Sequence, residues 1–153
     1  MATLFALANL FILPFWVLMI AFPHWRWTRR IMDSLWPVVI PALAYALLAV
    51  PALASTAFGI PVLPAGPEAL LNPTLPKIMT LLGAEAGATI GWIHFLAFDL
   101  FVGRWAYLDS RERGLSAWLA SPALSFILML GPLGFLLYLL VRRLGAQKQV
   151  QKP

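Results

Sequence analysis

Long apolar stretches separated by short polar segments dominate the pattern along this chain. A helix needs roughly 20 residues to cross about 30 Å of hydrocarbon. Four stretches reach that length, and we expect one helix in each, at about 2–22, 35–58, 82–108 and 118–141. The predicted fold is therefore all-α, a four-transmembrane-helix bundle forming a single membrane domain over residues 1–153.

The segments between the apolar stretches contain the turn signals and most of the charge. Residues 60–76 are rich in Pro and Gly and predict a loop with short interfacial turns. Residues 142–153 form a basic C-terminal tail. The first stretch is followed by arginines rather than by a small-residue cleavage site, so we expect an uncleaved helix and not a signal peptide.

Composition supports a membrane protein and excludes several function classes. Only 11% of the residues are charged, against about 25% in soluble domains. The absence of cysteine excludes disulfides, thiolate chemistry and cysteine-ligated metals. The net charge of +5 lies beside apolar segments, which is typical of contact with anionic lipid rather than with nucleic acid. We therefore expect membrane lipids as partners, no nucleic acid, and a location in a bacterial plasma membrane or a thylakoid; the oligomeric state stays open.

The charge pattern gives only a weak orientation for four spans. Six Lys and Arg residues would lie on the side of the first and third connections, and five on the other side. The first helix usually dominates, and its flanks have three arginines after it and no basic residue before it. This favours both termini outside.

Glu85, His94 and Asp99 are ionisable residues within the third apolar stretch, which also contains Arg104 near its end. Such side chains cost roughly 2.5–3.5 kcal/mol each at membrane depth, so they usually face a protein interior and serve a function. On an ideal helix Glu85 and Asp99 share a face but lie roughly 21 Å apart, and His94 points about 140° away from Asp99. Their partners must therefore come from other helices.

Matching helix depths in an up-down bundle predicts those partners. We expect Tyr45, and Asn9 or Trp16, near the level of His94, Ser121 and Ser125 near Asp99, and Tyr138 or Arg142 near Glu85. Structural roles are also open, because a membrane histidine can fasten two helices and a carboxylate at a helix start suits the positive end of the dipole. With no ligand pair at helical spacing and no cysteine, we expect no metal site.

Several motifs together resemble a known family. They are Ala8-Asn9 with Leu13-Pro14-Phe15-Trp16, Pro23-His24-Trp25, the run from Gly91-Trp92-Ile93-His94 to Asp99-Leu100-Phe101-Val102-Gly103-Arg104, Ser121-Pro122, and Gly131-Pro132-Leu133-Gly134. Over nearly its whole length the chain resembles the abscisic-acid-deficient-four-like membrane proteins, whose plant members are associated with neoxanthin synthesis.

The resemblance implies a cofactor-independent isomerase acting on an epoxy-carotenoid or a related isoprenoid lipid. Opening the epoxide to the allenic isomer moves protons without net redox change, so an acid and a base in a dry pocket suffice. The implied catalytic residues are His94, Asp99 and Glu85. The substrate-binding candidates are Trp16, Trp92, Phe95 and Phe98, whose rings would pack the polyene, together with Asn9 and Tyr45 from the matching of helix depths.

Two other functions fit the same sequence, so whether the chain is an enzyme stays open. The first is a pigment- or lipid-binding accessory protein, which would use the aromatic groove but would not need His94. The second is a structural subunit of a larger membrane complex. Separate substitutions of His94 and Asp99 would distinguish these functions from catalysis.

Overall fold

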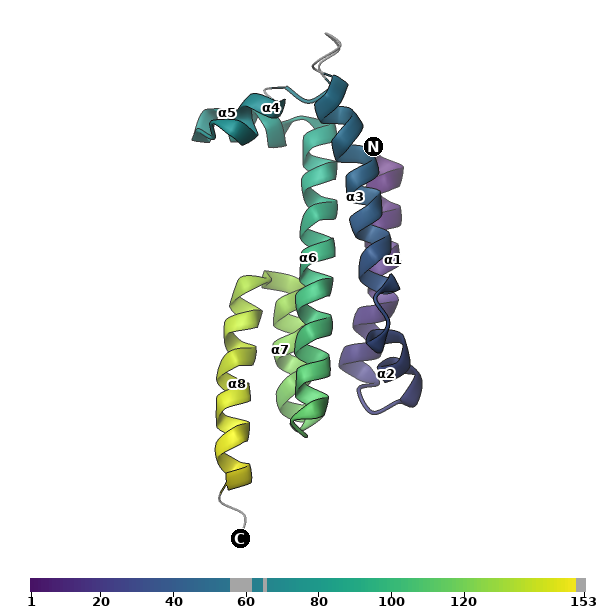
Figure 1. Ribbon diagram of the computed structural model, residues 1–153, viewed down its shortest axis with the longest axis vertical. Helices are drawn as coiled ribbons and strands as arrows, with labels where there is room; N and C mark the ends of the chain where they lie inside the picture. The colour runs from purple at the N-terminus through teal and green to yellow at the C-terminus, as the bar shows by residue number, and fades with distance from the viewer. Residues whose placement is uncertain (56–61, 65, 151–153) are drawn as a thin grey trace. The chain divides into compact units, whose positions relative to one another are not determined.

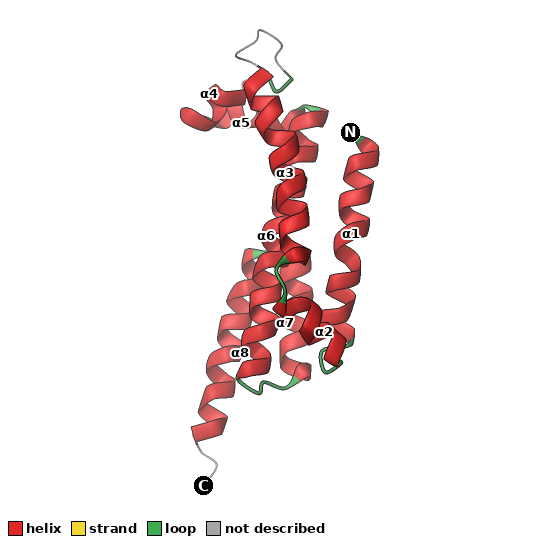
Figure 2. Ribbon diagram, turned by 45° about the vertical axis from the view of Figure 1, so that its right-hand side comes forward, coloured by secondary structure: helices red, strands yellow, loops and turns green. Residues whose placement is uncertain are grey.

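The computed structural model describes residues 1–55, 62–64 and 66–150, with side chains described as far as residue 144. Within this part the chain forms helices and loops only (Figure 2). The helices, labelled in Figure 1, are α1 (Ala2–Ala21), α2 (Arg26–Asp33), α3 (Trp36–Ala54), α4 (Gly66–Leu71), α5 (Leu75–Gly83), α6 (Glu85–Glu112), α7 (Ala117–Leu130) and α8 (Pro132–Val150). The prediction of an all-α fold is confirmed.

Three helices of the described chain are long and apolar enough to cross a membrane, judged by length and composition. They are α1, α3 and α6, which correspond to the predictions at 2–22, 35–58 and 82–108; residues 56–58 lie outside the described part. Large apolar side chains face outward along them, with Leu10 65% exposed and Leu47 74% exposed. A water-soluble surface rarely shows so many such side chains together, whereas lipid accommodates them.

The chain divides into two compact units. Unit 1 comprises residues 1–10 and 39–97, and unit 2 comprises residues 11–38 and 98–153. Three of the helices, α1, α3 and α6, contribute residues to both units.

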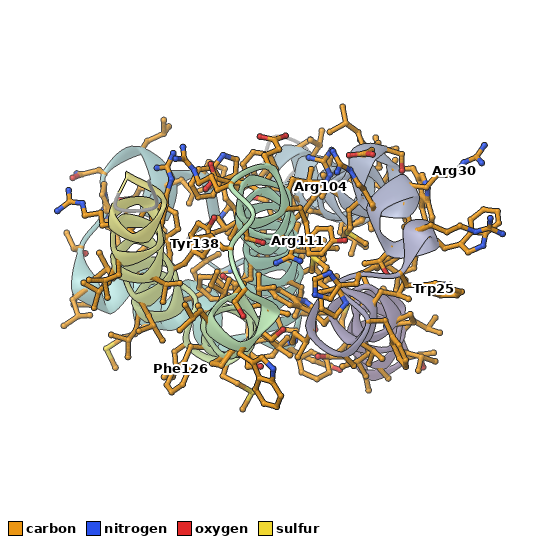
Figure 3. All side chains as sticks on the ribbon, turned by 90° about the horizontal axis from the view of Figure 1, so that it is seen from below. Trp25, Arg30, Arg104, Arg111, Phe126 and Tyr138 are labelled. Atoms are coloured by element: carbon orange, nitrogen blue, oxygen red, sulfur yellow. The ribbon has the colours of Figure 1, made fainter. Side chains whose placement is uncertain are left out.

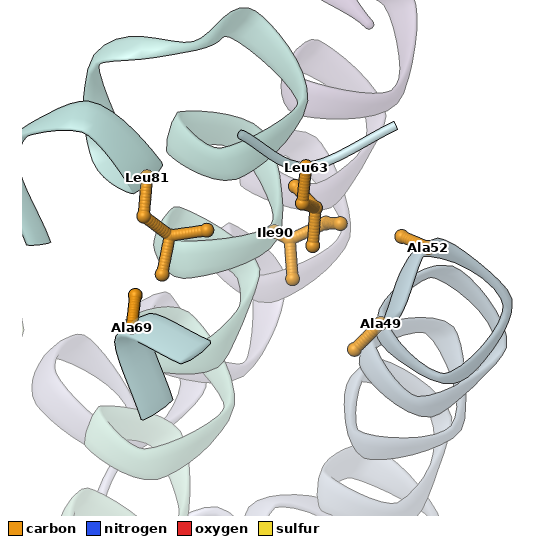
Figure 4. Close-up of a cluster of buried hydrophobic side chains, with 6 residues drawn as sticks. All are labelled: Ala49, Ala52, Leu63, Ala69, Leu81 and Ile90. Atoms are coloured by element: carbon orange, nitrogen blue, oxygen red, sulfur yellow. The ribbon is translucent and has the colours of Figure 1, made fainter. Parts of the chain in front are cut away.

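The core of unit 1 joins α3 to the segment that precedes α6. Its buried side chains are Ala49, Ala52, Leu63, Ala69, Leu81 and Ile90 (Figure 4). The loop predicted at 60–76 is wrong in part, because α4 and the start of α5 lie inside it; residues 60, 61 and 65 are outside the described part. A proline stands in the first turn of each helix, where its missing N–H costs no hydrogen bond.

Unit 2 contains a correction to the fourth predicted helix. The stretch 118–141 is not one helix, because α7 ends at Leu130 and α8 begins at Pro132 and returns beside α7 (Figure 1). Gly131 between them has φ 43° and ψ −99°, a backbone conformation that disfavours residues with a Cβ. The predicted spanning helix is therefore a helical hairpin.

The open end of this hairpin is held by Asp109 of α6. The hydroxyl of Tyr138 donates to Asp109 Oδ2 at 2.6 Å, and Arg142 Nε lies 3.0 Å from the same oxygen. Arg113 Nε lies 2.9 Å from Asp109 Oδ1. The predicted pairing of Tyr138 or Arg142 with Glu85 is therefore wrong, because the reversal at Gly131 returns α8 to the end of α6.

Side-chain donors from α6 and α7 bind carbonyl oxygens at the ends of α1 and α2. Arg104 donates to the carbonyls of Asp33 and Ser34 at 3.0 and 3.1 Å, at the end of α2 (Figure 3). The Ser121 hydroxyl donates to the carbonyl of Ile20 at 2.9 Å. The last carbonyls of a helix lack partners within it, so these contacts fix the ends of α1 and α2 within unit 2.

Candidate functional site

His94 and Tyr45 lie against each other in unit 1, and both are half-buried. Their ring centroids are 5.2 Å apart with 56° between the ring planes. Phe95 stands nearly edge-on to the imidazole, with centroids 6.0 Å apart. The prediction that Tyr45 lies near His94 is confirmed. An imidazole and a phenol hydroxyl therefore share one location, where both can exchange hydrogen bonds or protons with a ligand.

A cavity of about 270 Å³ lies beside this pair. It is bounded by α3, the segment 62–64, α4, α5 and α6, and its lining residues are Tyr45, Ala49, Leu53, Leu63, Leu70, Leu81, Leu82, Gly87, Ile90, Gly91, His94 and Phe95. His94 and Tyr45 supply the polar side chains of an otherwise apolar wall. An apolar pocket with a few convergent polar groups is the usual form of a small-molecule site.

The helices α4 and α5 form one wall of this cavity, its cover. The sequence predicted a loop over most of this segment instead. The end of α5 lies so close to α6 that a Cβ on Gly87 would overlap the carbonyl oxygen of Leu81. A Cβ on Gly91 would lie 3.1 Å from the Leu82 side chain. Gly83, Gly87 and Gly91 recur at every fourth residue, a spacing that lets two membrane helices approach closely. This glycine spacing is the feature of the sequence that indicates a close approach of α5 to α6.

An ion pair links the two short helices that cover the cavity. Lys77 Nζ of α5 lies 2.6 Å from Glu68 Oε1 of α4. The hydrogen bond from Lys77, together with its positive charge, lowers the pKa of the Glu68 carboxyl below its ordinary value. Because Glu68 is exposed, the pair orders the surface of the cover rather than its core.

Asn9 and Trp92 contact each other and are not among the residues that line the cavity. The Trp92 indole N–H donates to Asn9 Oδ1 at 3.1 Å, and the Asn9 amide donates to the Phe5 carbonyl at 2.7 Å. The Phe5 ring stacks on Trp92 with centroids 5.6 Å apart. These contacts join α1 to α6 within unit 1, and a substrate-binding role for Asn9 and Trp92 stays a prediction.

Trp16, Phe98 and Asp99 belong to unit 2. Trp16 is 1% exposed and packs against Gly103, while Phe98 is 58% exposed. Asp99 is half-buried beside the hairpin turn, and its Oδ1 would be 2.8 Å from a Cβ on Gly131. Substrate binding by Trp16 and Phe98, and catalysis by Asp99, stay predictions.

Glu85 is the first residue of α6 and faces outward, with its side chain 74% exposed. Its Oε1 lies 3.7 Å from the amino group of Met1. A carboxylate in the first turn stabilises a helix through its dipole, so the structural interpretation accounts for this residue. Among the residues that the structure describes, no three His, Asp or Glu side chains group as metal ligands.

Comparison with known proteins identifies the family of this chain. The family described as ABA DEFICIENT 4-like matches residues 3–138 of the chain. The chain belongs to the ABA DEFICIENT 4-like family. The matched range contains Asn9, Tyr45, His94 and Asp99, together with the hairpin turn at Gly131.

One relative is the Arabidopsis thaliana protein named Protein ABA DEFICIENT 4, chloroplastic. It is 26% identical over 137 residues, which cover 87% of this chain and 57% of the relative. The chain thus spans little more than half the length of that family member. No solved structure matches the chain.

Proposed function

We propose that this ABA DEFICIENT 4-like protein is a membrane isomerase of an epoxy-carotenoid or a related isoprenoid lipid, and that His94 and Tyr45 are its reacting side chains. The observation that supports this most is the contact of the two rings at the wall of an apolar cavity. Family membership and the apolar helices α1, α3 and α6 support a lipid-soluble substrate.

The proposed reaction needs one proton donor and one proton acceptor. As the epoxide C–O bond breaks, its oxygen gains a proton, and a neighbouring polyene carbon loses a proton as the allene forms. The product is an isomer of the substrate, so no electron acceptor is consumed. An imidazole can take the carbon proton, while the Tyr45 hydroxyl hydrogen-bonds to the developing alkoxide and gives it a proton. Tyr45 then recovers a proton from the imidazolium of His94, whose ring lies against its own, so both side chains return to their starting states.

The size of the cavity indicates how such a substrate would lie. About 270 Å³ is below the usual range of about 300–1,000 Å³ for complete drug-sized ligands. The cavity therefore suits one oxygenated end ring, and the long polyene would extend along the apolar surface beside Phe95, which is 56% exposed.

This proposal differs from the sequence-based prediction in its choice of residues. It replaces Asp99 and Glu85 by Tyr45, because Tyr45 shares the cavity wall with His94. Asp99 is assigned to the hairpin turn beside Gly131, and Glu85 to the start of α6.

The test compares pigments in a host strain that makes epoxy-carotenoids and lacks its own copy of the gene. The wild-type chain should convert part of the epoxide pool, while His94→Ala and Tyr45→Phe should accumulate equally as protein and convert much less. Leu47→Ala is the matched control, because Leu47 lies on α3 two residues from Tyr45 and is exposed. Unchanged pigment conversion by His94→Ala would reject the proposal.

A pigment- or lipid-binding accessory protein is the second candidate. The aliphatic character of most of the cavity wall favours it, since apolar contact alone binds an isoprenoid. Mass analysis of small molecules that co-purify with the protein distinguishes the two functions. The accessory function predicts a single bound species that His94→Ala retains, whereas the isomerase predicts that His94→Ala accumulates bound substrate in place of product.

We also propose a membrane topology. In it α1, α3 and α6 each cross the bilayer once, and α7 with α8 forms a re-entrant hairpin. The apolar part of α8, from Pro132 to Val141, is followed by Arg142 and Arg143. At 1.5 Å per residue it reaches about half the hydrocarbon thickness. The contacts of Tyr138 and Arg142 with Asp109 support the return of α8 to the side where α6 ends.

This topology changes how the Lys and Arg residues divide between the two sides of the membrane, which for four spans was six against five. With three crossings, the α1–α3 connection and everything after α6 lie on one side. Of the eleven Lys and Arg residues, all except Lys77 then belong to that side or to helix ends that face it. Because basic residues are retained on the cytoplasmic side, the proposal places the N-terminus outside and the hairpin opening inside, in place of two termini outside.

A further inference from the structure

Unit 2 contains a second and larger cavity, of about 800 Å³, that the proposed function does not use. It lies where α1 ends, α6 ends and α7 begins. Ile20, Leu115 and Ala117 contribute apolar wall, and Arg111, His24 and Ser121 contribute polar groups. An elongated ligand with one polar end matches this division.

Arg111 faces this cavity with a positive charge that has only neutral partners. Its Nη2 donates to the Leu115 carbonyl at 2.5 Å, its Nε to Ser110 Oγ at 3.4 Å, and its Nη1 lies 3.2 Å from His24 Nδ1. A guanidinium has five N–H donors, so two are left for a ligand. Among the described residues no carboxylate pairs with Arg111, whereas Arg113, two residues on, pairs with Asp109.

His24 adds a neutral hydrogen-bonding edge to the same location. Because a guanidinium can only donate, the contact with Arg111 requires His24 Nδ1 to be the acceptor, which leaves the proton on Nε2. The second nitrogen is then an N–H donor. Arg111 and His24 together present donors and no acceptor, a combination that selects an anion.

The surroundings indicate that this anion belongs to a lipid. Trp118 lines the cavity and is 90% exposed, as expected for an indole at a membrane interface. Arg26 and Arg30 stack over Trp27 on neighbouring α2, at 5.7 and 5.5 Å from the ring centroid. Figure 3 shows Arg30 and Trp25 extending away from the helices, while Arg111 lies between α6 and α1.

We propose that this cavity is a binding site for one membrane glycerolipid with an anionic phosphodiester headgroup. Arg111 pairs with the phosphodiester, and the wall from α1 and α7 contacts the glycerol and the start of an acyl chain. The site lies in unit 2 and does not depend on the isomerase proposal. The bound lipid would fasten the start of the hairpin to the end of α1.

The test measures lipid retained by the full chain in native mass spectrometry after reconstitution with phosphatidylglycerol or phosphatidylcholine. The wild type should retain one phosphatidylglycerol in preference to phosphatidylcholine. Arg111→Gln should weaken that binding about tenfold, the usual effect of losing one charge-assisted hydrogen-bond donor. Arg30→Gln removes the same charge from an exposed position and should leave the binding close to that of the wild type.

A cavity-filling variant makes the test independent of the charge. Ala117→Phe leaves Arg111 in place but occupies the apolar wall, so it should also lose phosphatidylglycerol while keeping its helical content. Equal losses in Arg111→Gln and Arg30→Gln would overturn the proposal in favour of diffuse attraction to the basic surface. Retention by Ala117→Phe, equal binding of both lipids, or displacement by millimolar inorganic phosphate would also overturn it.

Discussion

Two features of the structure favour glycine over any larger residue at position 131. Its φ of 43° lies in the region that side chains with a Cβ rarely adopt, and the carboxylate of Asp99 occupies the position next to the missing Cβ. The same carboxylate lies beside the residue that precedes α8, where the helix dipole favours negative charge. One glycine and one aspartate therefore define where the hairpin turns.

We expect Gly131→Ala to lower the free energy of unfolding in detergent by about 1–3 kcal/mol from the backbone conformation alone, and by more through the contact with Asp99. Thermal unfolding followed by circular dichroism measures this. Gly83→Ala is the control, since a Cβ there meets nothing within 4 Å. Combining Gly131→Ala with Asp99→Ala should cost less than the sum of the two single changes; strict additivity would contradict the proposed contact.

Asp109 is the second residue on which the hairpin depends. Its carboxylate, with the side chain only 13% exposed, accepts hydrogen bonds from Tyr138 and Arg113 and forms an ion pair with Arg142. We expect Asp109→Asn to cost about 1–3 kcal/mol, reduced by solvent screening of the half-exposed arginines. Arg113→Gln should cost less than about 1 kcal/mol, since Arg113 is exposed. Equal unfolding temperatures for the two variants would show that the carboxylate has no central role.

At the scale of elements, the short helices α4 and α5 form the cover of the His94 cavity, and their position depends on the close approach at Gly87. We expect Gly87→Ala to displace the end of α5 and cost about 1–3 kcal/mol, the usual effect of overpacking. Ligand retention should fall in this variant although His94 and Tyr45 are unchanged. Gly83→Ala, at the last residue of α5, should retain the ligand like the wild type, because a Cβ there meets nothing within 4 Å. Equal retention by both variants would contradict the assignment of α5 as a cover.

The sequence predicted α1, α3 and α6 well, because an apolar run of membrane length has few alternatives to a helix. It also predicted the contact of Tyr45 with His94, since a fixed rise per residue sets depth even when rotation is unknown. It did not predict the break at Gly131, because hydropathy is continuous from 118 to 141 and a Gly-Pro pair is tolerated within membrane helices. Because the break was not predicted, Tyr138 and Arg142 were expected near Glu85 instead of Asp109.

At the scale of the whole molecule, the three crossings and the re-entrant hairpin predict which residues share a side of the membrane. The chain has no cysteine, so single cysteines can be labelled with a membrane-impermeant maleimide. Cysteines replacing Arg30, Ser116 and Leu144 should react from one side, and one replacing Asn72 should react from the other. Labelling of position 144 together with position 72 would instead support four crossings.

His94 and Tyr45, the proposed reacting pair, determine whether the protein is an isomerase. The most direct measurement is conversion of a purified epoxy-carotenoid by the protein in nanodiscs, with product separated chromatographically and identified by mass. We expect the wild type and Leu47→Ala to convert the substrate, and His94→Ala to lose about 10²–10⁴-fold in rate while still binding it. Tyr45→Phe should show an intermediate loss. Conversion by His94→Ala at the wild-type rate would contradict the assignment of His94 as a reacting side chain.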